Sequence, residues 1–401
     1  MGKAILYVGN YIFPNGNASG KRVYGNACIF RDLGYKVFSI GFHKGNELSV
    51  SSKEYNNITY SSIPYVDGVK RLNISAPYRI IKAKIDEIVG KGYKLSAIVM
   101  YGSLATSELN IQIIRWGKKH RVPVYYDHVD IFPTPQKKPF ARYIMKLREN
   151  RQLDKKVFPS CDGIICISSY LANKHAPYCK TVIVPPVVET QYRAIEVSNV
   201  SKVKIVYAGT ISDKNRPVEE WKDRIDLMID SVYQLSESGY DNFCFTLIGF
   251  RAEDFIANLP IELKDEYREK VEKLAGKVSF MGYMSFDDAM NEIRKSDFSI
   301  LIRDKKVTTM AGFPTKVSES ITCGIPVIAN DTSDISKYII DGVNGFVVET
   351  SGFVDCLKRV CDMPRDMINA LKDKCYDTKS FRYSEYLNKV AAFLNNGGDG
   401  I

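Results

Sequence analysis

Short apolar runs alternate with longer mixed segments along the first half of the chain. The apolar runs are typical of strands buried on both faces of a parallel sheet, and they lie at residues 4–9, 36–42, 95–101, 122–127 and 163–168. Segments with helical spacing separate them, among them Lys21–Leu33, Tyr78–Val89 and Ser107–His120. This alternation predicts an α/β fold with a doubly wound sheet covered by helices on both faces.

The alternation breaks at Tyr178–Val203, where two consecutive prolines and a polar run indicate a linker. Strand-like runs then resume at residues 203–209, 243–250, 277–282, 298–303, 325–330 and 345–349. The pattern predicts two Rossmann-like domains that face a cleft, at residues 1–190 and 200–378. Ligands of such sheets bind at the carboxyl ends of the strands.

A last helix, residues 379–396, is expected to cross back and pack on the first domain. Its apolar residues Tyr386, Val390 and Phe393 recur at helical spacing. They form one face that another part of the protein must cover.

Composition narrows the class of protein. With 401 residues, 45% of them hydrophobic and 25% charged, the chain suits two domains of roughly 150–200 residues each. No apolar stretch reaches about 20 residues, and the N-terminus leads straight into a strand, so a cytoplasmic protein is expected. The nine cysteines form no CxxC pair, and neither a disulfide framework nor a metal site is predicted. No GxGxxG or P-loop motif is present, so no cofactor is expected.

The charge is distributed unevenly. Residues 1–190 contain 28 basic and 13 acidic residues, whereas residues 191–401 contain 28 and 33. Two basic stretches with interleaved apolar residues, Lys70–Lys94 and Lys137–Lys156, account for much of the difference. They suit contact with the anionic inner face of a membrane or with a lipid-linked acceptor. The alternative is that they are solvated helix faces whose apolar side belongs to the core. Nucleic acid is not expected, since no nucleic-acid motif accompanies the charge.

The most informative segment is residues 300–330, where a predicted strand leads through residues 312–314 into a helix at 315–324. A helix start preceded by glycine offers backbone N–H groups and a partial positive charge to an anion. Lys316 is unfavourable in this first turn, and a bound phosphate would offset that cost. One turn later, Glu319 could accept the hydroxyls of a ribose. An ordinary capped helix with an exposed lysine is the alternative.

The stretch AGFPTKVSESITCGIPVIA within this segment resembles the donor-site signature of retaining glycosyltransferases of family 4, which have the GT-B fold. The strands VKIVYAG, FTLIG and VSFMG lie at the family's usual distances, so the resemblance covers the C-terminal half. It implies transfer of a sugar from a nucleoside-diphosphate sugar to a glycan hydroxyl, with retention, in bacterial-type surface polysaccharide assembly. A GT-B nucleotide-sugar epimerase, or a non-catalytic nucleotide-sugar-binding partner of an active transferase, is the alternative.

The resemblance also implies roles for single residues. Glu319 corresponds to the residue that holds the donor ribose. A lysine would neutralise the leaving diphosphate. Lys222 fits this role by its distance from the following helix, and Lys214 is the alternative. Either lysine could instead be an ordinary surface charge. The first glutamate of the family pattern falls on Ala311, which puts the sugar identity in doubt. The other donor-binding positions are Gly209, Thr210, Arg303, Gly312, Phe313, Pro314, Thr315 and Lys316.

Two features of the first half are candidates for the acceptor side. A flexible loop containing Asn17, Ser19 and Gly20 opens a helix, and in the related transferases this loop closes over donor phosphates and acceptor. At the end of a predicted strand, His128 is a candidate catalytic residue that would touch the sugar. The carboxylates of Asp127 and Asp130 could orient its imidazole, and a strand-end histidine satisfied by these carboxylates is the alternative.

Overall fold

Two compact units make up the chain in a computed structural model. Unit 1 consists of Met1–Glu189 and Arg382–Ile401, and unit 2 of Thr190–Phe381. Unit 2 is therefore inserted between two separate segments of unit 1. The residues that the structure describes are 1–14, 16–44, 51–65, 75–102, 107–131, 140–195, 201–211 and 216–395.

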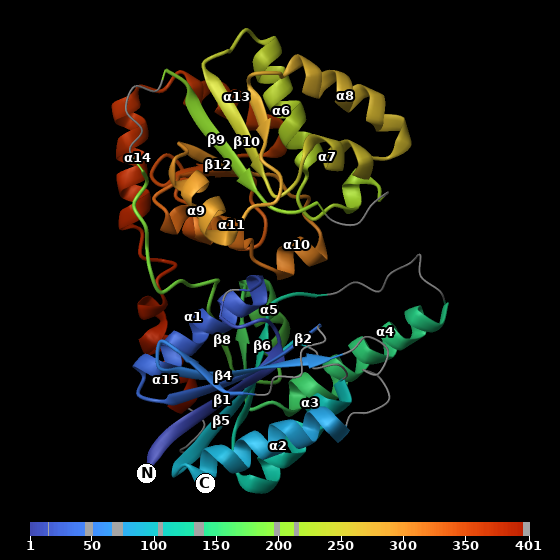
Figure 1. Cartoon of the computed structure of the whole chain (residues 1–401), viewed down its shortest axis with the longest axis vertical. Coiled ribbons are helices and arrows are strands. Elements are labelled where there is room, and N and C mark those ends of the chain that lie inside the picture. The colour runs from blue at the N-terminus through green and yellow to red at the C-terminus, as the bar shows by residue number, and fades with distance from the viewer. Residues whose placement is uncertain are drawn as a thin grey trace. The chain divides into compact units, whose positions relative to one another are not determined.

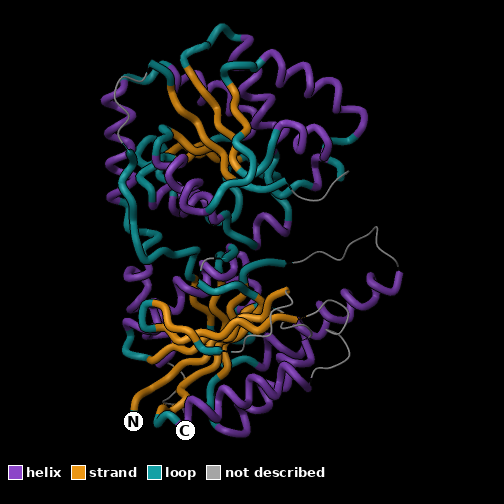
Figure 2. The backbone as a smooth tube through the Cα atoms, viewed as in Figure 1, coloured by secondary structure: helices purple, strands orange, loops and turns teal. Residues whose placement is uncertain are grey.

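Unit 1 is built on an eight-stranded sheet, drawn in orange in Figure 2. Its strands pair in parallel, except that the edge strand β3 runs antiparallel to β4. Their order across the sheet is β3 (Lys53–Tyr55), β4 (Ile58–Tyr65), β2 (Lys36–Lys44), β1 (Gly2–Asn10), β5 (Tyr93–Tyr101), β6 (Val124–His128), β7 (Gly163–Cys166) and β8 (Thr181–Ile183).

Helices cover this sheet, with α1 beside α15 and α2 beside α3 (Figure 1). The helices of unit 1 are α1 (Ala18–Asp32), α2 (Ser75–Gly90), α3 (Ser107–His120), α4 (Phe140–Gln152), α5 (Ser169–His175) and α15 (Leu387–Asn395). The last of these joins the main core, because Val390 and Phe393 lie in the same hydrophobic cluster as Tyr125 of β6. The rings of Phe393 and Tyr125 lie 5.1 Å apart.

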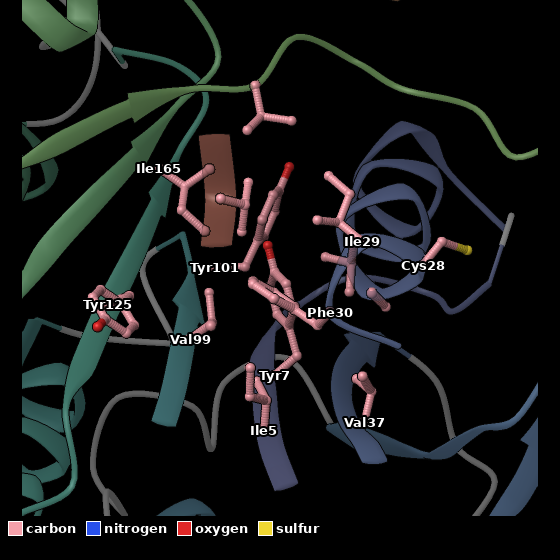
Figure 3. Packing of buried hydrophobic residues seen from close by; sticks show 14 of the residues in the cluster. Ile5, Tyr7, Cys28, Ile29, Phe30, Val37, Val99, Tyr101, Tyr125 and Ile165 are labelled. Carbon is pink, nitrogen blue, oxygen red and sulfur yellow. The ribbon is translucent and has the colours of Figure 1, made fainter. Parts of the chain in front are cut away.

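The core of unit 1 lies between the central strands and α1. Figure 3 shows Tyr7 of β1 close to Phe30 and Ile29 of α1, and the Tyr7 and Phe30 ring centroids are 6.2 Å apart. Each of these side chains is at most 1% exposed. Burial of this kind contributes roughly 1.5–3 kcal/mol for each large apolar side chain.

Unit 2 repeats the architecture with a six-stranded parallel sheet. The strand order is β11 (Val278–Phe280), β10 (Phe243–Ile248), β9 (Val203–Ala208), β12 (Phe298–Leu301), β13 (Val327–Ala329) and β14 (Gly345–Val347). Its helices are α6 (Ile225–Glu237), α7 (Ala252–Asn258), α8 (Lys264–Lys273), α9 (Phe286–Arg294), α10 (Val307–Ala311), α11 (Thr315–Thr322), α12 (Ile335–Tyr338), α13 (Phe353–Cys361) and α14 (Arg365–Asp377). The prediction of two α/β parallel-sheet domains is thus confirmed.

Two local features differ from the sequence-based expectation. The segment Tyr178–Val203, predicted to be a linker, contains the short strand β8, which completes the sheet of unit 1. The pattern also gave no sign of the β3–β4 hairpin. Its turn residues Asn56 and Asn57 have φ angles of 47° and 63°, the left-handed conformation that asparagine tolerates in tight hairpin turns.

Candidate functional site

Four side chains meet at the carboxyl ends of the central strands of unit 2. The Asp223 carboxylate, just ahead of α6, is their shared partner: it accepts from Arg303 Nε at 2.6 Å and from the Tyr207 hydroxyl at 2.8 Å. Lys316 Nζ, from the first turn of α11, lies 2.8 Å from the same carboxylate. Tyr207 is the last residue but one of β9, and Arg303 follows β12. Two adjacent strands, the start of α11 and the segment ahead of α6 therefore supply the cluster.

The electrostatics of this cluster favour an ionised Asp223 and a neutral Tyr207. Burial alone would raise the pKa of Asp223, but the charges of Arg303 and Lys316 outweigh it and hold that pKa well below its usual range. Burial and the Asp223 charge raise the pKa of Tyr207 well above its usual value. Two cations therefore share one carboxylate, and the cluster has an excess positive charge that an anion could neutralise.

Arg303 has one further binding group to offer. Its side chain is 4% exposed, and its Nη1 atom is buried with no hydrogen-bond partner among the described residues. Asn330 holds the backbone of Arg303 on both sides, because its Oδ1 accepts from Arg303 N at 2.9 Å and its Nδ2 donates to Arg303 O at 2.6 Å. Asn330 thus fixes the backbone of Arg303 and Asp223 holds its Nε, while Nη1 has no partner in the described part of the chain, a costly arrangement.

The start of α11 lies against the end of β9. A Cβ atom at Gly209 would come within 2.5 Å of Lys316 Cε and of the Tyr207 hydroxyl, so only glycine lets this lysine lie so close to the strand end. The helix begins at Thr315 after Pro314 and has no acidic residue in its first turn. Val317 N donates to the Pro314 carbonyl at 3.1 Å, and the N–H groups of Thr315 and Lys316 precede any possible partner within the helix. They leave a partial positive charge at this end of α11.

The far end of α11 matches its predicted boundary. The helix ends at Thr322, and Gly324 adopts a left-handed conformation with φ of 71°. Ile325 N donates to Ser320 O, and Gly324 N donates to Ile321 O, both at 3.0 Å. These two bonds form a Schellman motif, the usual way in which glycine ends a helix.

The predicted donor residues occupy different positions relative to the cluster. Glu319, half-buried, follows Lys316 by three residues and shares its helix face. Lys222 is exposed, and its neighbour Asp223 makes the contacts described above. Lys214 lies outside the described residues. Thr210 is exposed at the end of β9.

The structure gives the contacts of two predicted donor positions, Arg303 and Phe313. Arg303 pairs with Asp223, while Asp304 binds Arg224 at 3.0 Å. The Phe313 side chain is not available to a phosphate, because it packs against Tyr338 and Phe381 with ring centroids 5.3 and 5.8 Å away. Burial of an aromatic side chain stabilises the fold instead.

Asp223 is the residue that sequence reasoning missed. It is 8% exposed, yet it stands between two charged residues in the stretch EEWKDRID, which reads as a solvated surface. Its one sequence signal is the neighbouring apolar pattern of α6, which places position 223 just before a buried helix.

In unit 1, His128 ends β6 and is almost completely buried. Its Nδ1 lies 2.7 Å from His175 Nε2, and its Nε2 lies 3.0 Å from the backbone carbonyl of Asp130. His175 Nδ1 in turn lies 2.5 Å from the Tyr178 hydroxyl. Because a carbonyl can only accept, His128 Nε2 carries the proton. In the neutral imidazoles, His128 Nδ1 then accepts from His175 Nε2, and His175 Nδ1 accepts from the Tyr178 hydroxyl.

The prediction that carboxylates orient the His128 imidazole therefore needs correction. A second imidazole and a backbone carbonyl hold His128, and the Asp127 carboxylate is engaged elsewhere. It accepts from Arg22 Nη2 at 2.8 Å and from Asn26 Nδ2 at 3.0 Å, and the Tyr7 hydroxyl donates to it at 2.5 Å. Arg22 and Asp127 form a fully buried ion pair, with side chains 3% and 0% exposed.

The two histidines predict a pH dependence of stability. Burial, followed by the Lys174 charge, lowers the pKa of His175 to about 4, and burial lowers the pKa of His128 well below its usual value. The unfolded chain binds these protons near pH 6.5. Through His175, the free energy of unfolding should therefore decrease by about 3 kcal/mol as the pH falls from 6.5 to 4. In urea unfolding across this range, the free energy of unfolding should fall less steeply with pH in His175→Gln than in wild type. An identical pH dependence in the two proteins would contradict the lowered pKa of His175.

The predicted loop of unit 1 forms a helix cap. Asn17 is the N-cap of α1, and its Oδ1 accepts from Gly20 N at 2.7 Å. Ser19 hydrogen bonds to the Tyr101 hydroxyl at the end of β5. A Cβ atom at Gly20 would lie 2.0 Å from the Ile12 carbonyl oxygen, so this glycine lets the loop fold back on itself. The exposed Asn17 and half-buried Ser19 mark the carboxyl edge of this sheet.

The described residues contain neither a metal-ligand cluster nor a membrane-spanning helix. No group of three or more histidine, cysteine, aspartate or glutamate side chains in these ranges is arranged to hold a metal ion. Within the same ranges, no helix has both the length and the apolar character that a membrane-spanning segment requires.

Residues 202–363, most of unit 2, match the family model described as "Glycosyl transferases group 1". No curated protein matches the chain by sequence. The match lies in the unit that contains the Asp223 cluster and α11.

Solved structures with the same fold cover almost the whole chain. Sucrose-phosphate synthase from Thermosynechococcus elongatus is 12% identical, with a TM-score of 0.66 and 98% of each chain covered. HepE from Anabaena, solved in complex with UDP and glucose, is 14% identical, with a TM-score of 0.62 and coverage of 98% of this chain and 100% of that one. A glycosyltransferase from Rickettsia africae is 11% identical, with a TM-score of 0.64 and both chains fully covered. The fold is that of the GT-B glycosyltransferases, and the family match supports the same class of enzyme.

Proposed function

We propose that this chain of the GT-B glycosyltransferase fold transfers a sugar from a nucleoside-diphosphate sugar to a glycan hydroxyl. The observation that carries the proposal is the cationic cluster of unit 2, in which Arg303 and Lys316 share the single carboxylate of Asp223 beside the start of α11. HepE, one of the similar structures, was solved with UDP and with UDP-glucose. A nucleoside diphosphate has the charge and the size that such a cluster would accept.

The cluster suits a leaving diphosphate. As the bond to the sugar breaks, negative charge grows on the diphosphate, and fixed cations near that position stabilise the transition state more than the ground state. Lys316, Arg303 and the N–H groups of the first turn of α11 supply such positive charge without a metal ion. Lys222, exposed beside Asp223, is a further cation for this role.

Other roles follow from the resemblance in the sequence. Glu319 would accept the ribose hydroxyls, and the backbone at Gly209 and Thr210 would face the diphosphate. In unit 1, His128 and the loop at Asn17 would serve the sugar and the acceptor, a glycan that is lipid-linked in surface polysaccharide assembly. If transfer proceeds with retention, a diphosphate oxygen can take the proton of the acceptor hydroxyl, so no protein nucleophile is required.

Nucleotide binding without metal tests the proposal directly. UDP or GDP at 100 times its dissociation constant should stabilise the folded chain by about 2.7 kcal/mol, because it binds only the native state. Thermal unfolding with each nucleotide, with and without EDTA, measures this. Stabilisation that EDTA abolishes, or none with any nucleoside diphosphate, would contradict the proposed donor site.

Glu319→Ala should weaken donor binding by about 1–3 kcal/mol, the usual cost of leaving hydroxyls without a charged acceptor. Isothermal titration with the nucleotide measures the loss, and Glu319→Gln, which keeps an acceptor oxygen, should lose less. Thermal stability without ligand should change little, because Glu319 is only half-buried. Equal affinity in wild type and Glu319→Ala would place the ribose elsewhere.

A second candidate function is favoured by Ala311, which stands where the family pattern has a glutamate and is 0% exposed. A site without that carboxylate could bind a nucleotide sugar without transferring it, as a partner of an active transferase would. An epimerase of the same fold would instead convert the sugar of a UDP-sugar in the absence of any acceptor. Product analysis of a UDP-sugar, incubated with and without a glycan acceptor, distinguishes the three.

A further inference from the structure

The two basic stretches of unit 1 differ in how their charges are used. In α2, Lys84 is 8% exposed and contacts Ser52 Oγ at 2.7 Å and Glu87 at 2.6 Å. Lys91 binds the same Glu87 at 2.7 Å. The start of this stretch, including Lys70, lies outside the described residues. Much of the described charge of α2 is therefore neutralised within the protein.

The stretch around α4 is different. Its two acidic residues are already paired, Glu149 with Lys146 at 3.6 Å and Asp154 with Lys174 at 2.8 Å. Four exposed cations remain for which the described part of the chain supplies no ion pair: Arg148, Arg151, Lys155 and Lys156.

Apolar side chains share the same face of this helix. Ile144 and Leu147 are 44% and 40% exposed, and together with Arg148 and Arg151 they fall at positions i, i+3, i+4 and i+7 of one helical face. In Figure 1, α4 extends away from the sheet of unit 1. We call these four residues, together with Lys155 and Lys156 of the π-helical segment Leu153–Val157 that follows α4, the outer face of α4.

We propose that the outer face of α4 docks on an anionic lipid bilayer. Cations without carboxylate partners complement anionic headgroups, and Ile144 and Leu147 can enter the boundary between headgroups and acyl chains, as in other interfacial helices. Each cation near such a surface raises binding about fivefold. Nucleic acid would satisfy the charges but would leave the two apolar side chains in water.

Vesicle sedimentation with purified full-length protein tests the proposal. Wild type should pellet with vesicles of phosphatidylcholine containing phosphatidylglycerol, and should be released as salt rises. It should not pellet with phosphatidylcholine alone. The quadruple variant R148Q/R151Q/K155Q/K156Q should bind the anionic vesicles about 600-fold more weakly, since four cations each contribute about fivefold.

Two further variants test whether the position of the removed charges matters and whether the apolar side chains of α4 contribute to binding. K264Q/R268Q/K273Q/K295Q removes the same charge from unit 2, where Arg268, Lys273 and Lys295 pair with nearby carboxylates; it should bind anionic vesicles almost as wild type does. I144S/L147S, which keeps every charge, should bind about tenfold more weakly. Circular dichroism and thermal unfolding confirm that each variant is folded, independently of any donor binding.

The outcomes are decisive in both directions. Equal pelleting with neutral and anionic vesicles, or wild-type binding by R148Q/R151Q/K155Q/K156Q, would overturn the proposal. Tight binding of labelled duplex DNA or RNA that I144S/L147S leaves unchanged, with no vesicle binding, would assign the face to nucleic acid instead. Weakening in both α4 variants, but not in the unit 2 control, would establish the bilayer as the partner.

Discussion

Lys316→Met is expected to lower kcat by about 100- to 1,000-fold, the usual effect of removing one preorganised group that stabilises transition-state charge. The variant loses the cation that lies beside Gly209 and the first turn of α11. Methionine keeps the length of the side chain, so packing against Tyr207 is largely preserved. Steady-state kinetics with a nucleotide sugar and a glycan acceptor measure the effect.

Two matched variants sharpen this prediction. Lys305→Met removes a 53% exposed lysine in the loop after β12, 3.6 Å from Glu349, and should leave kcat unchanged. Lys222→Met tests the lysine that the resemblance favours. A large loss in Lys222→Met with a small one in Lys316→Met would move the diphosphate toward Lys222 and would contradict the role given to the Asp223 cluster.

Arg22→Met should destabilise the protein by about 3–5 kcal/mol, since it leaves the buried Asp127 carboxylate without its cation. Arg22 contacts this carboxylate through Nε at 3.1 Å and Nη2 at 2.8 Å. Its Nη1 also donates to the carbonyls of Val184 and Pro185, at 2.7 and 3.0 Å. Urea unfolding followed by circular dichroism measures the change.

A double variant shows whether the cost comes from the unpaired charge. In Arg22→Met with Asp127→Leu, both charges are gone, and stability should recover part of the loss because no buried carboxylate remains uncompensated. Arg79→Met, at an exposed position of α2, should cost less than about 1 kcal/mol. If Arg22→Met were as stable as Arg79→Met, the buried pair would not support unit 1.

The fold was predictable because its signals are local. Buried parallel strands and helix boundaries depend on nearby residues, and the helix that begins after Pro314 and ends ahead of Gly324 follows from its own capping residues. The β3–β4 hairpin was missed because Asn56 and Asn57 mark a turn only through their backbone conformation. The strand β8 was missed because three residues next to a proline pair resemble a linker.

The candidate site was only partly predictable. Lys316 and Glu319 stand within one continuous motif, so the sequence alone places them on one helix face. Asp223 joins Arg303 and Lys316 only after β9 and β12 have paired side by side. The same holds for His128, whose partner His175 follows a different strand. Contacts between residues far apart in the sequence depend on the order of strands, which a single sequence does not specify.

The insertion of unit 2 into unit 1 has a consequence for synthesis on the ribosome. The last helix, α15, places Phe393 against Tyr125, and Lys180 Nζ donates to the Phe393 carbonyl at 2.5 Å. Unit 2 is continuous and can fold as soon as it has emerged, whereas unit 1 must wait for α15, which is made after unit 2, to complete its core. A premature stop after residue 381 would therefore leave the later-made unit intact and the earlier-made one incomplete, exposed to chaperones and proteases.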